Sequence, residues 1–265
     1  MRVIIIPTDF SENAFNALTC ALQYFINVEA TFIIVHTYEE RERHLLQEFD
    51  SQLDHLLERV DYLTDNPLHH FKTKVICGTF ITQINDLVDA QNADLIVMGT
   101  KGKTADRTLS FGSNTLEVKK SVTCPVLAIP LELEFKSPDH ILFPSELLIP
   151  FENRELDLVS DIAHHHGSEI TLLHLAKSDT LSLRQLKIKA LLESRFRESK
   201  ITYQRHDPGV PATIFHNFII QNNSDLLVLV NSKHSFLESL LQLPTVDFLS
   251  THLKIPFLTL QNLPR

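Results

Sequence analysis

The chain has 265 residues and a formal net charge of −9, and 43% of its residues are hydrophobic. This apolar fraction is typical of globular proteins and argues against disorder. The acidic balance, without a dense run of lysine and arginine, argues against nucleic acid or an anionic membrane surface as the main partner. The length is sufficient for one large domain or two ordinary ones.

Cysteine usage and the first residues bear on the cellular compartment. The cysteines are three in number and widely spaced in apolar contexts, so we expect buried thiols in a reducing compartment: Cys20, Cys77 and Cys124. The apolar run at residues 3–6 is too short for a signal peptide or a membrane span. These observations predict a cytoplasmic protein.

The first half of the chain alternates short apolar runs with amphipathic stretches. Strands are expected at residues 3–6, 31–36, 71–77, 94–99 and 125–129. Helical spacing of apolar residues is expected at 11–25, 39–63, 82–90 and 113–121. This alternation predicts an α/β fold, a doubly wound parallel sheet of five strands in the Rossmann-like class. Ligands of such sheets bind beyond the carboxyl ends of the strands.

The second half repeats the pattern of the first. The matching segments are 4–9 with 141–146, 30–36 with 169–174, 94–98 with 225–229 and 124–127 with 255–258. Repetition of this kind predicts two tandem copies of one fold. We place the domains at residues 1–132 and 138–265, with a polar join between them.

Three of the six glycines lie in one window that follows the fourth expected strand: Gly99, Gly102 and Gly112. Glycine lets a backbone approach a ligand closely, and the N-terminus of a helix offers N–H groups to an anion. Ser113 or Asn114 is placed to cap the helix that follows. The window is therefore a candidate phosphate-binding loop, although three glycines can also mark three turns.

Charged residues near the expected strand ends support a binding role. Asp9 directly follows the first strand, where a carboxylate either binds a ligand or caps the next helix. Lys101, Lys103 and Arg107 lie in the glycine-containing window and could offset the charge of a triphosphate or of its metal ion. The alternative is a solvated basic loop.

These motifs together resemble the universal stress protein family. The residues that carry the resemblance are Pro7, Thr8, Asp9, His36, Gly99, Gly102, Gly112 and Ser113. In that family the spacing Gly-x2-Gly-x9-Gly-Ser marks the branch that binds ATP. The resemblance covers both halves of the chain, but the motifs are complete only in the first. It implies a fold of the adenine nucleotide alpha hydrolase type.

The resemblance also implies a site for ATP, with Mg²⁺, in the first domain. Asp9 would hold the ribose, and Thr37 would offer its backbone to adenine. The expected cofactor-binding residues are Pro7, Thr8, Asp9, Thr37, Met98, Gly99, Lys101, Gly102, Lys103, Gly112, Ser113 and Asn114. No catalytic side chain and no protein ligand for a metal is expected.

The second copy keeps the spacing of the motif but has no glycine in it. Its corresponding residues are Glu146 for Asp9, Asn231 for Gly99, His234 for Gly102, Pro244 for Gly112 and Thr245 for Ser113. Proline lacks the N–H group that a phosphate needs. We therefore expect the second domain not to bind ATP in the manner of the family. It could bind another ligand or supply a surface for a partner.

Association of the two domains is a further implication of the resemblance. Members of the family usually dimerise through their last strands, and a tandem chain can form the equivalent pseudo-dimer internally. In this chain the pairing would join residues 125–129 to residues 256–260. Two chains could also associate further.

The histidines are expected to be structural. His164, His165 and His166 precede Gly167 at the expected end of a helix. There glycine caps the helix and the histidines complement its dipole, so this role is favoured over a metal site. His36 and His174, at matching strand ends, are expected to be packing residues.

Three functions remain open at this point. The first is an ATP-binding regulator of the stress response, which needs no catalytic base. The second is a slow ATPase or nucleotide-dependent enzyme, in which Asp9 helps to hold a metal and Lys101 or Lys103 stabilises the transferred phosphate. The third is an adaptor that binds no nucleotide. No base for hydrolysis is evident in the sequence, so at most weak ATPase activity is expected.

Overall fold

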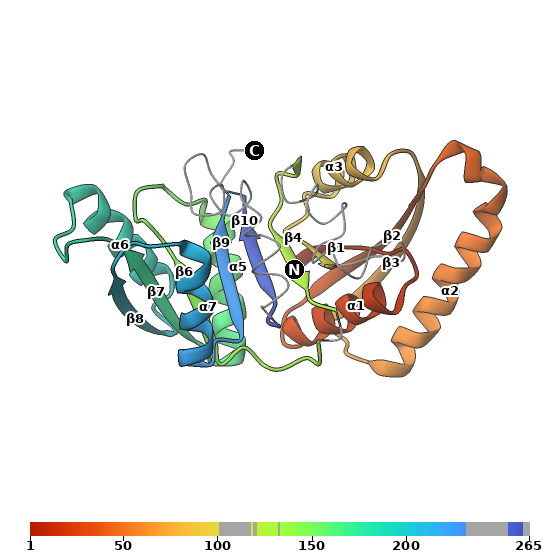
Figure 1. Cartoon of the computed structure of the whole chain (residues 1–265). Helices are drawn as coiled ribbons and strands as arrows, with labels where there is room; N and C mark the ends of the chain where they lie inside the picture. Colours follow the sequence, from red (N-terminus) through yellow and green to blue (C-terminus); the bar gives the residue numbers. More distant parts are fainter. Residues whose placement is uncertain (101–117, 119–120, 132, 232–253, 262–265) are drawn as a thin grey trace. The chain divides into compact units, whose positions relative to one another are not determined.

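The computed structural model describes residues 1–100, 118, 121–131, 133–231 and 254–261 (Figure 1). The chain divides into two compact units, Met1–Phe135 and Lys136–Arg265. Each unit is an α/β structure in which helices alternate with parallel strands. The predicted fold class is thereby confirmed.

The first unit contains one parallel sheet. Its described strands are β1 (Arg2–Pro7), β2 (Ala30–Tyr38), β3 (His69–Cys77), β4 (Leu95–Gly99) and β5 (Val126–Ile129). They lie in the order β3-β2-β1-β4-β5, and each pair of neighbours is parallel. The order changes direction between β1 and β4, which is the point where open α/β sheets bind ligands.

The helical segments of the first unit connect these strands. They are α1 (Glu12–Tyr24), the 3-10 helix η1 (Glu40–Leu45), α2 (Leu46–Leu63) and α3 (Phe80–Gln91). Helix α1 presents buried Ala14, Ala17, Leu18 and Ala21 on one face, as the helical spacing predicts. Small alanine side chains on this face allow α1 to pack closely against β4, beside the ligand-binding edge of the sheet.

The second unit repeats this arrangement. Its described strands are β6 (His140–Pro144), β7 (Glu169–Leu175), β8 (Lys200–His206), β9 (Leu226–Val230) and β10 (Phe257–Leu260). Its described helices are α5 (Asn153–His166), α6 (Leu183–Arg195) and α7 (Pro211–Asn222). The strand order β8-β7-β6-β9-β10 matches that of the first unit, with the change of direction between β6 and β9.

Two expectations need correction. Residues 40–45 form a 3-10 helix rather than the first turn of α2, with local ion pairs such as Arg43–Glu40 at 2.7 Å. Cys77 is exposed rather than buried, because it is the last residue of edge strand β3. Its Sγ donates to a carboxylate oxygen of Glu40 at 3.1 Å. Cys20 and Cys124 are buried, as expected.

The run of histidines ends helix α5, as predicted. Gly167 caps the helix with φ +66°, and its N–H donates to the carbonyl oxygen of His164. Among the described residues no group of three potential metal-ligating side chains is found. Within that same part of the chain, none of the helices has the length and hydrophobicity required to cross a membrane.

Candidate functional site

The candidate site lies at the carboxyl ends of β1 and β4. Asp9 follows β1 by two residues, and Gly99 is the last residue of β4. Because β1 and β4 are parallel neighbours at the change in strand order, these two residues lie on either side of the point where a crevice for a ligand is expected. Pro7 is the last residue of β1 and Thr8 lies between the strand and the acid, and both are buried.

A tight turn carries the chain from β1 to Asp9. The N–H of Thr8 still donates to the β2 carbonyl of Val35 at 2.9 Å, while its Oγ1 accepts from the N–H of Phe10 at 3.0 Å. His36 Nδ1 lies 2.8 Å from the carbonyl oxygen of Thr8 and must be the donor, since a carbonyl can only accept. Phe10 has φ +59°, which is costly for a bulky residue. The acid is therefore presented by a turn fixed from both sides.

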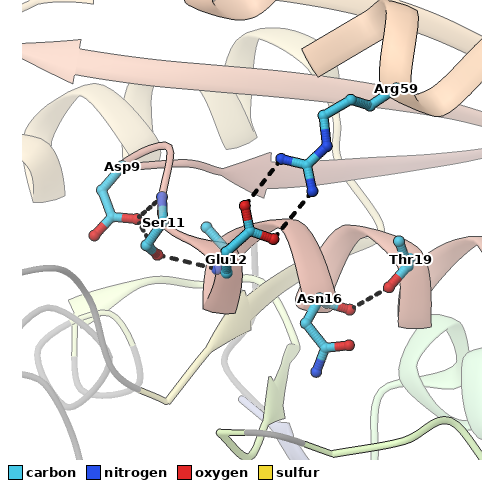
Figure 2. Close-up of polar contacts among 7 residues, drawn as sticks. Asp9, Ser11, Glu12, Asn16, Thr19 and Arg59 are labelled. Carbon is cyan, nitrogen blue, oxygen red and sulfur yellow. Dashed lines mark hydrogen bonds and ion pairs between the residues drawn. The ribbon is translucent and has the colours of Figure 1, made fainter. Parts of the chain in front are cut away.

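Ser11 fixes the carboxylate of Asp9 (Figure 2). Asp9 Oδ1 accepts from the N–H of Ser11 at 3.1 Å and from its Oγ at 2.5 Å. The same Oγ accepts from the N–H of Ala14 at 3.1 Å, which makes Ser11 the N-cap of α1. The orientation of the acid is thus coupled to the start of a helix.

On the β4 side, Gly99 is required by the packing of α1. A Cβ added to Gly99 would lie 2.8 Å from Cγ of Asn13 and 3.2 Å from its main-chain oxygen. Neither separation is tolerated by real Cβ atoms without movement of the neighbour. Asn13 is 7% exposed, a polar residue on the buried face of α1 that the sequence reasoning missed. An asparagine within an alanine-rich helix face was the signal available for it.

Met98 and Thr100 flank this glycine. Met98 is buried and belongs to the core cluster that includes Ile5 and Ile96, so its side chain packs in the hydrophobic core at this end of β4. The N–H of Thr100 donates to the carbonyl oxygen of Ile129 at 2.8 Å and extends the pairing of β4 with β5. The backbone is thus held in an extended path up to the beginning of the glycine-containing window.

Thr37 directs its backbone toward the crevice. In a parallel ladder, the N–H and C=O groups of successive residues point alternately to the two neighbouring strands. Val35 faces β1, because its oxygen accepts from Thr8, and Tyr38 faces β3, because its oxygen accepts from Gly78 at 2.8 Å. Thr37 therefore faces the β1 side, beyond the residue where β1 turns away. Its polar backbone groups lie where a ligand could replace a strand.

An aromatic cluster lies beside Thr37, and the sequence reasoning did not identify it. The ring of His36 is 4.5 Å from that of Phe10 and 4.5 Å from that of Phe49 on α2. Tyr38 lies 5.7 Å from Phe49, and burial together with the neighbouring Cys77 raises the pKa of its hydroxyl. The turn that carries Asp9 is thus packed against the second helix as well as against β2.

A second link joins α1 to α2. Arg59 makes two hydrogen bonds to the carboxylate of Glu12, at 3.1 and 3.0 Å, in a bidentate pair (Figure 2). Its guanidinium carbon lies 3.5 Å from the centre of the Phe15 ring. Hydrogen bonding to Arg59 lowers the pKa of Glu12. This pair joins α2 to the first turn of α1, which directly follows the N-cap Ser11.

Part of the predicted site falls outside the described residues. These positions are Lys101, Gly102, Lys103, Arg107, Gly112, Ser113 and Asn114. The structure therefore brings together Asp9, Thr37 and Gly99, and the predicted phosphate-binding loop begins directly after them. The roles of the loop residues stay predictions.

The second unit contains the same turn with other side chains. Leu147 has φ +56°, and its N–H donates to Oγ of Ser145 at 3.1 Å. His174 Nδ1 donates to the carbonyl oxygen of Ser145 at 3.0 Å. These contacts reproduce those of Phe10, Thr8 and His36. His36 and His174 therefore share one structural role, as expected for packing residues.

Within the described residues, a pocket of about 20 Å³ lies beside Glu146 in the second unit. Apolar Leu147, Ile149 and Phe151 contribute to its lining. This volume suffices for about one water molecule. Burial raises the pKa of Glu146. Asn231, which corresponds to Gly99, donates from Nδ2 to Oε1 of Gln261 at 2.7 Å.

Comparison with known proteins places the first unit in a family. The model of the universal stress protein family matches residues 1–130. A universal stress protein of Methanocaldococcus jannaschii is 29% identical over an alignment of 138 residues, which covers 48% of this chain and 81% of that protein. Residues 1–130 therefore match the universal stress protein family, in agreement with the resemblance in the sequence motifs.

Two further similarities are to a solved structure that matches nearly the whole chain and to an antiporter. A crystal structure of a universal stress protein from Archaeoglobus fulgidus has a TM-score of 0.71 at 13% identity and covers 98% of this chain and 96% of its own. That likeness is one of fold. A Na⁺/H⁺ antiporter of Synechocystis is 31% identical over 113 residues, 42% of this chain, and the chain spans only 16% of the antiporter.

Proposed function

We propose that a chain whose first unit is a universal stress protein domain with this geometry binds an adenine nucleotide, ATP with Mg²⁺, in that unit. The observation that supports the proposal most directly is the position of Asp9 and Gly99 at the carboxyl ends of the neighbouring strands β1 and β4, where the strand order changes. Asp9 presents a fixed carboxylate, and Gly99 has no side chain, because one would overlap Asn13 of α1. Nucleotide occupancy would then regulate a response to stress in the cytoplasm.

The donors and acceptors of the described site match the parts of a nucleoside. A carboxylate can accept two hydrogen bonds from the neighbouring hydroxyl groups of a ribose, the part assigned to Asp9. The N–H and C=O of Thr37 can pair with the edge of adenine in the way a strand would pair. Bound Mg²⁺ would supply charge neutralisation to the phosphates, with Lys101 and Lys103 as further positive charges.

The second unit is proposed not to bind ATP. Within the described residues, its pocket beside Glu146 is lined largely by apolar side chains and has room for about one water molecule. Asn231 engages Gln261 within the protein, so the close approach that Gly99 allows is lost. Its role would be to supply a surface, either to the first unit as a pseudo-dimer or to a second chain.

Regulation through occupancy is favoured over an enzymatic function. The described contacts of Asp9 are those of a positioned hydrogen-bond acceptor, with Ser11 as its donor. An ATPase would need a group that activates water. Release of phosphate from ATP, measured over hours with purified protein, separates the alternatives. Binding without turnover agrees with the regulator, whereas turnover that disappears in Asp9→Ala would establish the enzyme.

The binding proposal is tested with a matched pair of acid variants. Asp9→Ala is expected to weaken binding of ATP with Mg²⁺ about 10- to 100-fold, because hydrogen bonds to a charged group are lost. Glu146→Ala removes the corresponding acid of the second unit and is expected to leave affinity unchanged. Equal affinity for wild type and Asp9→Ala would contradict the assignment of the site.

A further inference from the structure

The two units present their acids on the same turn but hold them differently. In both, a hydroxyl accepts from the residue after the acid, and a histidine Nδ1 donates to the carbonyl before it. The residue after the acid has φ +59° in the first unit and +56° in the second. The turn alone therefore does not distinguish Asp9 of the proposed site from Glu146 of the second unit.

The difference lies two residues after the acid. Ser11 occupies this position in the first unit, and Leu148 occupies it in the second. Leu148 offers no side-chain donor and is 45% exposed. Helix α5 begins only at Asn153, and no side-chain hydrogen bond caps its start. The acid of the second unit thus lacks the helix-anchored hydroxyl that contacts Asp9.

We propose that Ser11 is a positioning residue, which orients the Asp9 carboxylate toward a cis-diol and so makes the site selective for ribonucleotides. This inference rests on the proposed nucleotide function and deepens it. Ser11 contacts Asp9 rather than the ligand. Its action is to determine which directions of the carboxylate remain available for hydroxyl groups.

The geometry of one hydroxyl group supports this role. A serine hydroxyl has one hydrogen to donate, and at 2.5 Å from Asp9 Oδ1 that hydrogen is directed at the carboxylate. A lone pair of the same oxygen receives the N–H of Ala14, so the rotation of the hydroxyl is fixed at both ends. The N–H of Ser11 adds a second donor to Oδ1. Asp9 is consequently held in one rotamer before a ligand arrives.

Preorganisation of this kind affects only ligands that use the carboxylate. A ribonucleotide presents its 2′- and 3′-hydroxyl groups to Asp9, whereas a 2′,3′-dideoxynucleotide presents none. Loss of the Ser11 hydroxyl should therefore weaken binding of ATP and leave binding of 2′,3′-dideoxy-ATP nearly unchanged. Loss of a helix cap with no positioning role would weaken both nucleotides equally.

The test measures affinities of the full chain for ATP and 2′,3′-dideoxy-ATP, each with Mg²⁺, in wild type, Ser11→Ala and Ser11→Thr. For Ser11→Ala we expect about a 10-fold loss for ATP, the size of one charge-assisted hydrogen bond, and less than about a 2-fold loss for the dideoxynucleotide. Ser11→Thr keeps the hydroxyl and should restore ATP binding. Ser182→Ala removes the comparable N-cap of α6 in the second unit and should change neither affinity.

The outcomes separate this inference from the proposed function. If wild type binds ATP better than the dideoxynucleotide and Ser11→Ala keeps that ratio, the positioning role is wrong and the nucleotide site stands. An equal loss of affinity for both nucleotides would mean that Ser11 acts only as a helix cap. If wild type binds neither nucleotide, the proposed function fails, and the inference fails with it.

Discussion

Single residues decide how the crevice of the first unit is shaped. Thr8, Asp9 and Phe10 form the turn, and Gly99 provides the opposite wall. The sequence predicts Asp9 and Gly99, because an acid after a buried strand and a glycine at a strand end are local signals. It does not predict Asn13 or Phe10 as neighbours of the site. Their roles depend on how α1 and α2 pack against the sheet.

The first prediction concerns Gly99. Gly99→Ala should destabilise the protein by about 1–3 kcal/mol, because the new methyl group overlaps the side chain of Asn13. Asn13→Ala removes that amide, so the double variant should recover part of the loss. Urea unfolding measures all three variants. Additive losses in the double variant would show that the two residues do not compete for this space.

The second prediction concerns His69, which is buried against Phe32 and Phe71. Its Nε2 donates to the carbonyl oxygen of Phe25 at 2.9 Å, and Nδ1 has no hydrogen-bond partner in the part of the chain that the structure describes. Burial lowers the pKa of His69 below the usual value of 6.5. The unfolded chain therefore binds a proton more readily than the folded one, and stability should fall as pH decreases below about 6.5.

Two histidine variants test this dependence. His69→Gln should flatten the loss of unfolding free energy between pH 7.5 and pH 5.5, because the group that titrates in the unfolded state is removed. His70→Gln changes the exposed neighbour on the same strand, whose charge is the smallest contribution to the lowered pKa of His69, and should leave most of the slope. Equal slopes in wild type and His69→Gln would show that another group controls this range of pH.

At the scale of the elements, hydrophobic pattern predicts most strands and helices. Apolar runs such as residues 3–6 become strands buried on both faces, and helical spacing defines α1. The 3-10 helix η1 could not be predicted in this way, because charged pairs stabilise it locally rather than a hydrophobic face. The exposure of Cys77 follows from strand order, which places β3 at the edge. Periodicity carries no information on that order.

The third prediction concerns the link between α1 and α2. Glu12 and Arg59 side chains are 81% and 49% exposed, so their pair should contribute only a few tenths of a kcal/mol. Arg59 lowers the pKa of Glu12, so this contribution is present above about pH 4.5 and is lost as pH falls below the lowered value.

The readout for this link is the stability difference between wild type and Glu12→Gln. The difference should be small and positive at pH 6, should shrink near pH 3 and should shrink in 1 M salt. Arg59→Ala should cost more than Glu12→Gln, since it also loses the stacking on Phe15. A difference that is independent of both pH and salt would mean that the pair contributes through packing alone.

In the whole molecule, the same strand order occurs in both units, but the two copies differ in the residues of the glycine motif. The sequence predicts the repetition, because matching segments recur in order along both halves. It also predicts that the glycines are lost from the second copy. The apolar lining of the pocket beside Glu146 by Leu147, Ile149 and Phe151 was not predicted, because it depends on how the connection between β6 and α5 packs.

We propose that the chain has one nucleotide site and that this site lies in the first unit. Calorimetric titration of ATP with Mg²⁺ into the wild-type chain and into Gly112→Pro tests it most directly. Gly112→Pro introduces into the first copy the residue found in the second. If the only nucleotide site lies in the first unit, we expect one site per chain in wild type and none in the variant. Two sites in wild type, or one site that persists in Gly112→Pro, would contradict it.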